Sequence, residues 1–296
     1  MSVATELRRR LRARLASGPI VVAPGIYDAY GARFVAEAGF EAVYMTGNGV
    51  SASLLGRPDV GLVDLTLFSQ HAHRAAAAVD IPLICDADTG YGNAVNVRRT
   101  VEEFEAAGVA AIHIEDQVSP KRCGQLPGAR PVIGFSEAVG KIEAAVAAKR
   151  DAQFVLIART DSAESLGLAE AIRRAQAFVK AGADVAFVEI KAGPGIVDDL
   201  KRIAGEVPAP CLVNVDAGGA LAALNADEIG ALGLRLAIYP GLARCAAGYA
   251  LQTACAALKR DGSTRAVRDR MLTPQQYNAA LGLAEIEAWE KKYVKE

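Results

Sequence analysis

Short apolar runs alternate with longer helical segments along most of the chain. Eight runs of four to six residues are rich in Val, Ile or Leu, and each is too short for a helix. The predicted strands are Ile20–Ala23, Ala42–Met45, Pro82–Cys85, Ala110–Ile114, Phe154–Ala158, Val185–Ile190, Cys211–Val215 and Leu234–Tyr239. The segments between them predict helices, several with a glycine at the exit that is typical of a C-cap; they include Tyr27–Ala38, Val97–Ala107, Ser136–Lys149, Leu168–Ala181 and Ala226–Leu232.

This alternation favours parallel strands with both faces covered, and eight such units match a (β/α)₈ TIM-type barrel in an α/β protein. An open doubly wound sheet is the alternative, but neither GxGxxG nor GxxxxGK[ST] occurs where that fold needs a phosphate loop. We therefore predict one barrel domain over residues 1–296, with a gate loop at about 117–131 and a helical appendage at about 263–296. Pro274 is placed near the start of a last helix whose apolar side carries Leu281, Ile286 and Trp289. We expect this appendage to pack on a neighbouring subunit or on its own barrel.

The composition narrows the functional classes. Hydrophobic residues make up 52% of the chain and the formal net charge is -1, which excludes a disordered chain and the basic footprint of a nucleic-acid binder. Charged residues interrupt every apolar stretch, so no membrane span is expected. Leu7, Leu11 and Leu15 recur at helical spacing and favour an amphipathic first helix over a targeting peptide. The five separated cysteines form no CxxC pair, which fits a reducing compartment and a cytoplasmic protein.

Polar residues gather where the predicted strands end, which is where a barrel places its active site. Asp86 and Asp88 lie two apart and would share one face of a strand, with Glu115 on the next strand. Hard carboxylates in this pattern suit an oxygen-loving dication, and Mg²⁺ fits best. The alternative is that DADTGYG is only a helix-capping turn.

The loop Ser119–Pro131 is long for a compact barrel, and such loops are usually functional lids. It carries Lys121, Arg122 and Cys123, and neighbouring cations can lower the pKa of a thiol. An exposed loop with an incidental cysteine is the equal alternative. The remaining cysteines lie in apolar runs or helices and are expected to be inert core residues: Cys85, Cys211, Cys245 and Cys255.

Two further candidates stand at strand ends. Arg159 could bind a substrate carboxylate as a fork, or it could form an ion pair with Asp161 or Glu189. His113 is the one histidine with a candidate catalytic position, the alternative being a hydrogen-bonded core histidine.

Nine motifs resemble those of one family. They are PGIYDAYGARFVAEAGF, YMTGNGVSAS, LGRPDVG, ICDADTGYGN, HIEDQVSPKRCG, IARTD, FVEI, LVNV and IYPG, and they run in order from Pro24 to Gly241. The chain resembles the isocitrate lyase / phosphoenolpyruvate mutase superfamily. It is most similar to the short bacterial branch that holds 2-methylisocitrate lyase, 2,3-dimethylmalate lyase, oxaloacetate hydrolase and carboxyphosphonoenolpyruvate mutase.

The resemblance implies a homotetramer of barrels that exchange a C-terminal helix. It implies Mg²⁺, with Mn²⁺ as a possible substitute, held largely through water. The metal residues it implies are Asp86, Asp88 and Glu115, with Asp59 nearby. Carboxylate-binding residues would be Thr46, Gly47 and Asn48 in the loop after the second strand. Lys121, Gly124 and Gln125 belong to the mobile gate, in which Cys123 is similar in position to the proton-donating cysteine of the lyases. Arg159, Glu189 and Asn214 would bind the second carboxylate or the enolate.

Two positions depart from the pattern of the lyases. Gln125 stands where the lyase gate usually has histidine, and a neutral amide can hydrogen-bond an oxyanion but cannot carry charge or relay a proton. Asn214 is followed by Val-Asp-Ala-Gly-Gly, which looks more like the dimethylmalate and oxaloacetate branch than like enzymes of tricarboxylates.

We therefore predict a Mg²⁺-dependent lyase that cleaves a 2-hydroxy di- or tricarboxylate of the 2-methylisocitrate or 2,3-dimethylmalate type into pyruvate or glyoxylate and a carboxylic acid. Tyr44 or a metal-bound water would act as base, and His113, Arg159 and Lys121 would stabilise the enolate that Cys123 protonates. The alternatives are an oxaloacetate decarboxylase or hydrolase, a carboxyphosphonoenolpyruvate phosphonomutase, and a binding barrel without catalysis. A small-molecule carboxylate is the expected ligand, with neither nucleic acid nor membrane as a partner.

Overall fold

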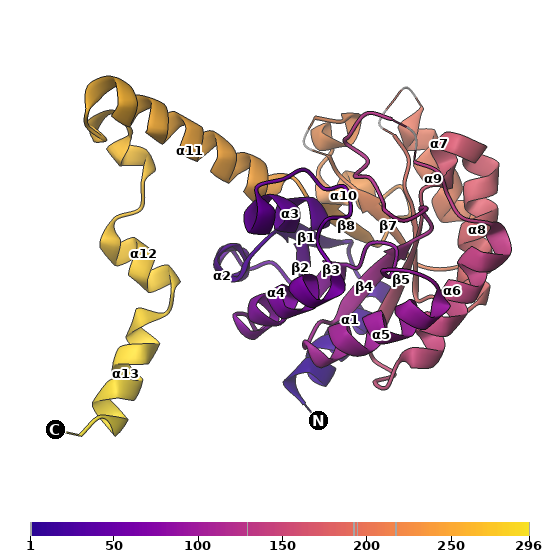
Figure 1. The fold of residues 1–296 in the computed structure, drawn as a ribbon, viewed down its shortest axis with the longest axis horizontal. Helices are drawn as coiled ribbons and strands as arrows, with labels where there is room; N and C mark the ends of the chain where they lie inside the picture. Colours follow the sequence, from indigo (N-terminus) through magenta and orange to yellow (C-terminus); the bar gives the residue numbers. More distant parts are fainter. Residues whose placement is uncertain (1, 129, 192, 194, 217, 296) are drawn as a thin grey trace.

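A closed barrel of eight parallel strands forms the centre of the protein (Figure 1). The computed structural model describes residues 2–128, 130–191, 193, 195–216 and 218–295. The strands follow in sequence order around the barrel: β1 (Val21–Ile26), β2 (Val43–Met45), β3 (Leu83–Asp86), β4 (Ala111–Glu115), β5 (Val155–Thr160), β6 (Val185–Val188), β7 (Cys211–Asn214) and β8 (Leu236–Tyr239). The predicted fold class is confirmed, because every predicted run coincides with a strand to within a few residues.

The barrel closes where β1 pairs on one side with β2 and on the other with β8. Gly25 lies opposite Tyr44 of β2, and Val21 lies opposite Leu236 of β8. Since all eight pairings are parallel, the carboxyl ends of all strands meet at one mouth. The residues expected at strand ends are therefore brought to one place.

Helices surround the barrel. In chain order they are α1 (Val3–Ala16), α2 (Ala29–Glu37), α3 (Gly47–Leu55), α4 (Leu65–Ala77), α5 (Ala94–Ala106), α6 (Phe135–Ala148), α7 (Ser162–Leu166), α8 (Leu168–Lys180), α9 (Ile196–Glu206), η1 (Ala220–Ala223) and α10 (Ala226–Gly230). The predicted amphipathic first helix is confirmed: Leu7, Leu11 and Leu15 of α1 are buried. Inside the barrel, Leu11 and Leu15 join Ile84, Phe187 and further strand residues in one apolar cluster. A second layer between strands and helices includes Phe68, Phe104 and Phe178.

The chain leaves the barrel after β8 and forms a helical arm, α11 (Leu242–Asp261), η2 (Arg265–Arg270), α12 (Pro274–Ala280) and α13 (Leu283–Tyr293) (Figure 1). The expected single last helix is two helices, because Gly282, with a φ of 78°, breaks the helix between α12 and α13. The arm touches the barrel at α2, where Arg33 Nε donates to the Ala280 carbonyl at 2.8 Å. Many of its large apolar side chains are exposed, among them Trp289 at 67%.

The cysteines divide between barrel and arm. Cys85 and Cys211 are buried, as expected, but Cys245 and Cys255 are exposed on α11. The expectation of core positions for these two is wrong, because their helix lies outside the barrel. Among the described residues, no helix combines the length and the apolar character that crossing a membrane requires.

Candidate active site

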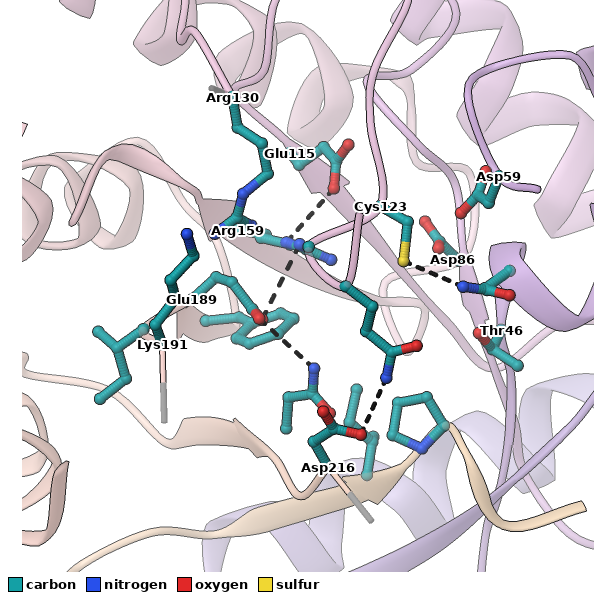
Figure 2. Close-up of a pocket in the computed structure, with 18 of the residues that line it drawn as sticks. Thr46, Asp59, Asp86, Glu115, Cys123, Arg130, Arg159, Glu189, Lys191 and Asp216 are labelled. Atoms are coloured by element: carbon teal, nitrogen blue, oxygen red, sulfur yellow. Dashed lines mark hydrogen bonds and ion pairs between the residues drawn. The ribbon is translucent and has the colours of Figure 1, made fainter. Parts of the chain in front are cut away.

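A cavity of about 250 Å³ opens at the mouth of the barrel (Figure 2). Most sequence-predicted site residues line it: Tyr44, Thr46, Asn48, Asp59, Asp86, Glu115, Lys121, Cys123, Gly124, Gln125, Arg159, Glu189 and Asn214. Three others, Gly47, Asp88 and His113, lie behind this lining and are buried. The structure thus brings the candidates from six strand ends (β2 to β7), from the gate loop and from the segment of Asp59 to a single pocket.

Three aspartates converge on the ammonium group of Lys121. The Lys121 Nζ atom lies 2.6 Å from Asp59 Oδ2, 2.7 Å from Asp88 Oδ1 and 3.9 Å from Asp86 Oδ2. Asp86 ends β3, but Asp88 does not share a strand face with it, because β3 ends first and Asp88 has a φ of 48°. The tight turn joins the two carboxylates instead, and the Asp88 N–H donates to Asp86 Oδ1 at 2.9 Å.

The pKa values of the carboxylates in this cluster shift in opposite directions. Burial raises the pKa of Asp88 to about 7, against the opposing effect of Lys121. Burial acts in the same direction on Asp86, but Lys121, His113 and Arg159 together hold the pKa of Asp86 well below its usual value. The three aspartates and Glu115 raise the pKa of Lys121 well above its usual value despite burial. Asp86 is therefore firmly ionised, whereas the protonation of Asp88 beside it changes easily near neutral pH.

The donor set suits a hard divalent cation. The convergence of Asp59, Asp86 and Asp88 on one ammonium group shows that this corner of the pocket accepts positive charge. Glu115 Oε1 is buried without a hydrogen-bond partner among the described residues. Within the same part of the chain, no three His, Cys, Asp or Glu side chains already stand together as a ready metal cage. The residues fit Mg²⁺, which takes one or two protein carboxylates and keeps several waters.

Tyr44 and His113 form a buried pair beneath the pocket. Tyr44 Oη lies 2.8 Å from His113 Nε2, and the two rings stack. Burial lowers the pKa of His113 to about 4, and burial raises the pKa of Tyr44 well above its usual value. At neutral pH the imidazole is therefore uncharged and the phenol keeps its proton. His113 does not line the cavity, so it acts on a ligand only through Tyr44.

The segment after β2 is helical rather than a loop. Gly47 is the first residue of α3, and its N–H donates to Asp86 Oδ2 at 3.2 Å. A Cβ atom at this position would lie 2.6 Å from Asp86 Oδ2, so only glycine allows this approach. The site thus needs Gly47 to place the Asp86 carboxylate, although Gly47 itself does not line the cavity.

The gate loop places Cys123 against Asn48. The Asn48 Nδ2 atom lies 3.1 Å from Cys123 Sγ, and the Cys123 N–H donates to the Asp59 carbonyl at 3.1 Å. The cationic neighbours in sequence do not contact the thiol, because Lys121 points to the aspartates and Arg122 donates to the Pro127 carbonyl. The loop therefore lines the cavity with its cysteine turned into the pocket (Figure 2).

Arg159 forms the predicted ion pairs and also faces the cavity. Its guanidinium lines the cavity and also lies 2.8 Å from Asp161 Oδ1, 3.3 Å from Glu115 Oε2 and 3.9 Å from Glu189 Oε2. These carboxylates raise the pKa of Arg159 well above its usual value, although burial opposes them. Burial raises the pKa of Glu115 and of Glu189. Arg159 is therefore a fixed positive charge whose donors are largely taken by the protein.

Three residues that line the cavity were not singled out in the sequence: Arg130, Asp216 and Arg244. Arg130, at the carboxyl end of the gate, pairs with buried Asp161 and with Glu164 at 3.0 Å. Asp216 and Arg244 line the cavity and contact Gln125 from opposite sides. The motif IARTD already held Asp161 at a strand end, but Arg244 lies in the helix α11, where nothing in the spacing distinguishes it from a surface arginine.

Known proteins are similar to this chain along almost its whole length. The family described as phosphoenolpyruvate phosphomutase matches residues 11–259. The chain is 43% identical over 284 residues to 2,3-dimethylmalate lyase of Eubacterium barkeri, covering 96% of this chain and 97% of that protein. A structure of oxaloacetate acetylhydrolase in complex with the inhibitor 3,3-difluorooxalacetate superposes with a TM-score of 0.91, at 34% identity, covering 99% of this chain and 98% of the other. A phosphonopyruvate hydrolase in complex with oxalate and Mg²⁺ superposes with a TM-score of 0.88, at 32% identity, covering 97% and 99%.

Proposed function

The chain belongs to the phosphoenolpyruvate mutase/isocitrate lyase superfamily as a carbon–carbon lyase, and on that premise we propose that its substrate is a methyl-substituted 2-hydroxy dicarboxylate of the 2,3-dimethylmalate type. The products are then pyruvate and propionate. One observation carries this proposal: a single cavity joins a carboxylate cluster on one side to Arg159 on the other, with Cys123 turned in between them (Figure 2).

We infer that Asp86 and Asp88 would hold Mg²⁺, with Glu115 and Asp59 in support. Bound there, the cation would supply Lewis acidity to a carboxylate and hydroxyl group of the substrate. The unpartnered Glu115 Oε1 and the buried Asp86 carboxylate support this assignment, as does the phosphonopyruvate hydrolase described with oxalate and Mg²⁺.

The chemistry assigned to the protein's own residues is a balanced cleavage. The C2 hydroxyl gives its proton to a water of the pocket, the C2–C3 bond breaks to leave a keto group at C2, and the electron pair moves to C3, which then takes the thiol proton of Cys123 to give the carboxylic acid product. Cys123 is the proton donor in this scheme, since its thiol faces the pocket beside Asn48. Tyr44 keeps its own proton at neutral pH and so serves in the resting site as a hydrogen-bond donor held in place by His113. Lys121 and Arg159 supply positive charge near the breaking bond.

The walls of the cavity favour methyl groups on the substrate. Apolar side chains lie beside the polar cluster, namely Phe187, Ile190, Ile196, Leu221 and Ile238, with Pro240 at the end of β8. Most cations of the cavity are already paired with carboxylates of the protein, which leaves little uncompensated charge for a third carboxylate of a substrate. Both features support a branched dicarboxylate over 2-methylisocitrate.

A substrate panel tests the proposal. The protein is incubated with Mg²⁺ and with 2,3-dimethylmalate, 2-methylisocitrate, isocitrate or oxaloacetate, and released keto acid is followed with a coupled dehydrogenase. We expect 2,3-dimethylmalate to have the highest kcat/KM. Faster cleavage of 2-methylisocitrate would show that this tricarboxylate is the substrate instead. Turnover of oxaloacetate alone would show that the protein is an oxaloacetate hydrolase or decarboxylase.

Cys123→Ser separates carbon–carbon cleavage from metal-driven decarboxylation. We expect this variant to lose lyase turnover by at least about 100-fold, because the hydroxyl is a far weaker proton donor to carbon, while decarboxylation of oxaloacetate is retained. Cys245→Ser on the exposed arm is the matched control and should keep full lyase activity. Equal loss of both reactions in Cys123→Ser would contradict the role of the thiol.

A further inference from the structure

The cations that line the cavity are not equivalent. Lys121, Arg130, Arg159 and Lys191 each form an ion pair with a carboxylate of the protein. Arg244, in the first turn of α11, lines the same cavity without such a pair among the described residues. Arg122 shares this property, but its guanidinium donates to the Pro127 carbonyl within the gate. Among the described residues, Arg244 is thus the cavity-lining cation outside the gate that has no carboxylate partner.

The only polar contact of the Arg244 side chain in the described part of the chain is with Gln125. Arg244 Nη2 donates to Gln125 Oε1 at 2.6 Å, and Arg244 Nε is buried without a hydrogen-bond partner. The N–H groups of Nε and Nη2 point the same way along one edge of the guanidinium. The amide oxygen of Gln125 accepts from only one of these two donors, Nη2. A carboxylate has two oxygens in the spacing that satisfies both donors.

Gln125 also separates Arg244 from an acidic neighbour. The Gln125 Nε2 atom donates to Asp216 Oδ1 at 2.9 Å, an interaction drawn at the labelled Asp216 in Figure 2. The Gln125 amide thus accepts a hydrogen bond from Arg244 through its oxygen and donates one to Asp216 through its nitrogen. Among the described residues, Asp216 is the carboxylate that contacts this pair, and the amide of Gln125 lies between it and the guanidinium.

We propose that Arg244 determines specificity by binding the substrate carboxylate farthest from the hydroxyl group, and that Gln125 keeps the guanidinium from pairing with Asp216 until the ligand replaces the amide oxygen. This inference takes from the proposed function only the premise that the ligand is a dicarboxylate. It assigns the far carboxylate to Arg244 rather than to Arg159, whose donors are occupied by Asp161 and Glu115.

Binding of matched ligands tests the role of Arg244 without requiring turnover. Affinities for malate, for malate 4-amide and for oxalate are measured by calorimetry with Mg²⁺ present, in the wild-type protein and in Arg244→Gln. We expect the variant to bind malate about 10- to 100-fold more weakly, and to bind the amide and oxalate as the wild type does. Arg173→Gln removes one charge from the exposed outer surface and should change none of the three affinities.

Equal weakening for malate and its amide would overturn the inference, as would a wild-type protein that does not bind malate. A failure of the proposed lyase reaction looks different, because the preference for malate over its amide would persist without cleavage of any hydroxy acid.

The role of Gln125 is tested in two backgrounds. Gln125→Ala should weaken malate binding, since Arg244 can then pair with Asp216. In an Asp216→Asn background the same change should cost several-fold less affinity, because the competing charge is gone. An identical loss in both backgrounds would contradict the separating role of Gln125.

Discussion

At the scale of single residues, the site depends on close approaches that leave no room for extra atoms. Gly47→Ala places a Cβ 2.6 Å from Asp86 Oδ2, so the carboxylate must move. We expect a loss of at least about 100-fold in kcat/KM, because displacements of about 1 Å at a reacting centre have effects of this size. Activity is measured as a function of Mg²⁺ concentration. Gly140→Ala in α6 is the control: no atom of the described residues lies within 4 Å of a Cβ at this position, and activity should not change.

His113 makes the stability of the folded protein depend on pH. Its pKa is about 4 in the folded protein and about 6.5 in an unfolded chain, so between these values the unfolded chain binds more protons. Stability contributed by neutral His113 is therefore present above pH 6.5 and is lost as the pH falls toward 4. We expect His113→Gln to reduce the slope of the unfolding free energy against pH in this window, by at most about 1.4 kcal/mol per pH unit.

Urea unfolding at several pH values between 7 and 4 measures that slope. His73→Gln, on the exposed side of α4, is the control variant. Parallel curves for the wild type and His113→Gln would show that the imidazole is not held neutral by the fold.

At the scale of elements, the gate is fixed at both ends. An antiparallel bridge between Gln117 and Val132 joins its two ends, and Arg130 near its carboxyl end pairs with Asp161 and Glu164. Arg130→Met removes the buried cation but leaves Asp161 its contact with Arg159, so complete unfolding is not expected.

We expect Arg130→Met to lower the unfolding free energy by about 1–3 kcal/mol and kcat/KM by at least about 10-fold, since the gate loses its anchor. Urea unfolding and limited proteolysis of the gate measure the two effects. Arg173→Met on the outer face of α8 should leave both unchanged within error. Proteolysis of the gate at the wild-type rate in Arg130→Met would contradict its role as an anchor.

At the scale of the molecule, the helical arm carries apolar surface that its own barrel does not cover. Trp289 and Ile286 of α13 are 67% and 55% exposed. Exposed apolar surface of this extent is typical of an interface, which supports the proposed homotetramer with exchanged C-terminal helices. We expect Ile286→Glu combined with Trp289→Glu to shift the protein to smaller species, measured by light scattering after size exclusion. Lys291→Glu is the charge control, and an unchanged mass for the double variant would exclude α13 from the interface.

The sequence by itself determined the barrel and most of its site. Strands buried on both faces have a continuous apolar pattern, and the parallel arrangement then forces strand-end residues such as Asp86, Arg159 and Asn214 to one mouth. The pattern did not determine side-chain partners. Asp88 reaches its neighbour through a turn with positive φ, and Gln125 meets Arg244 although 119 positions separate them. Such contacts depend on the relative placement of elements distant in sequence, which only the tertiary structure decides.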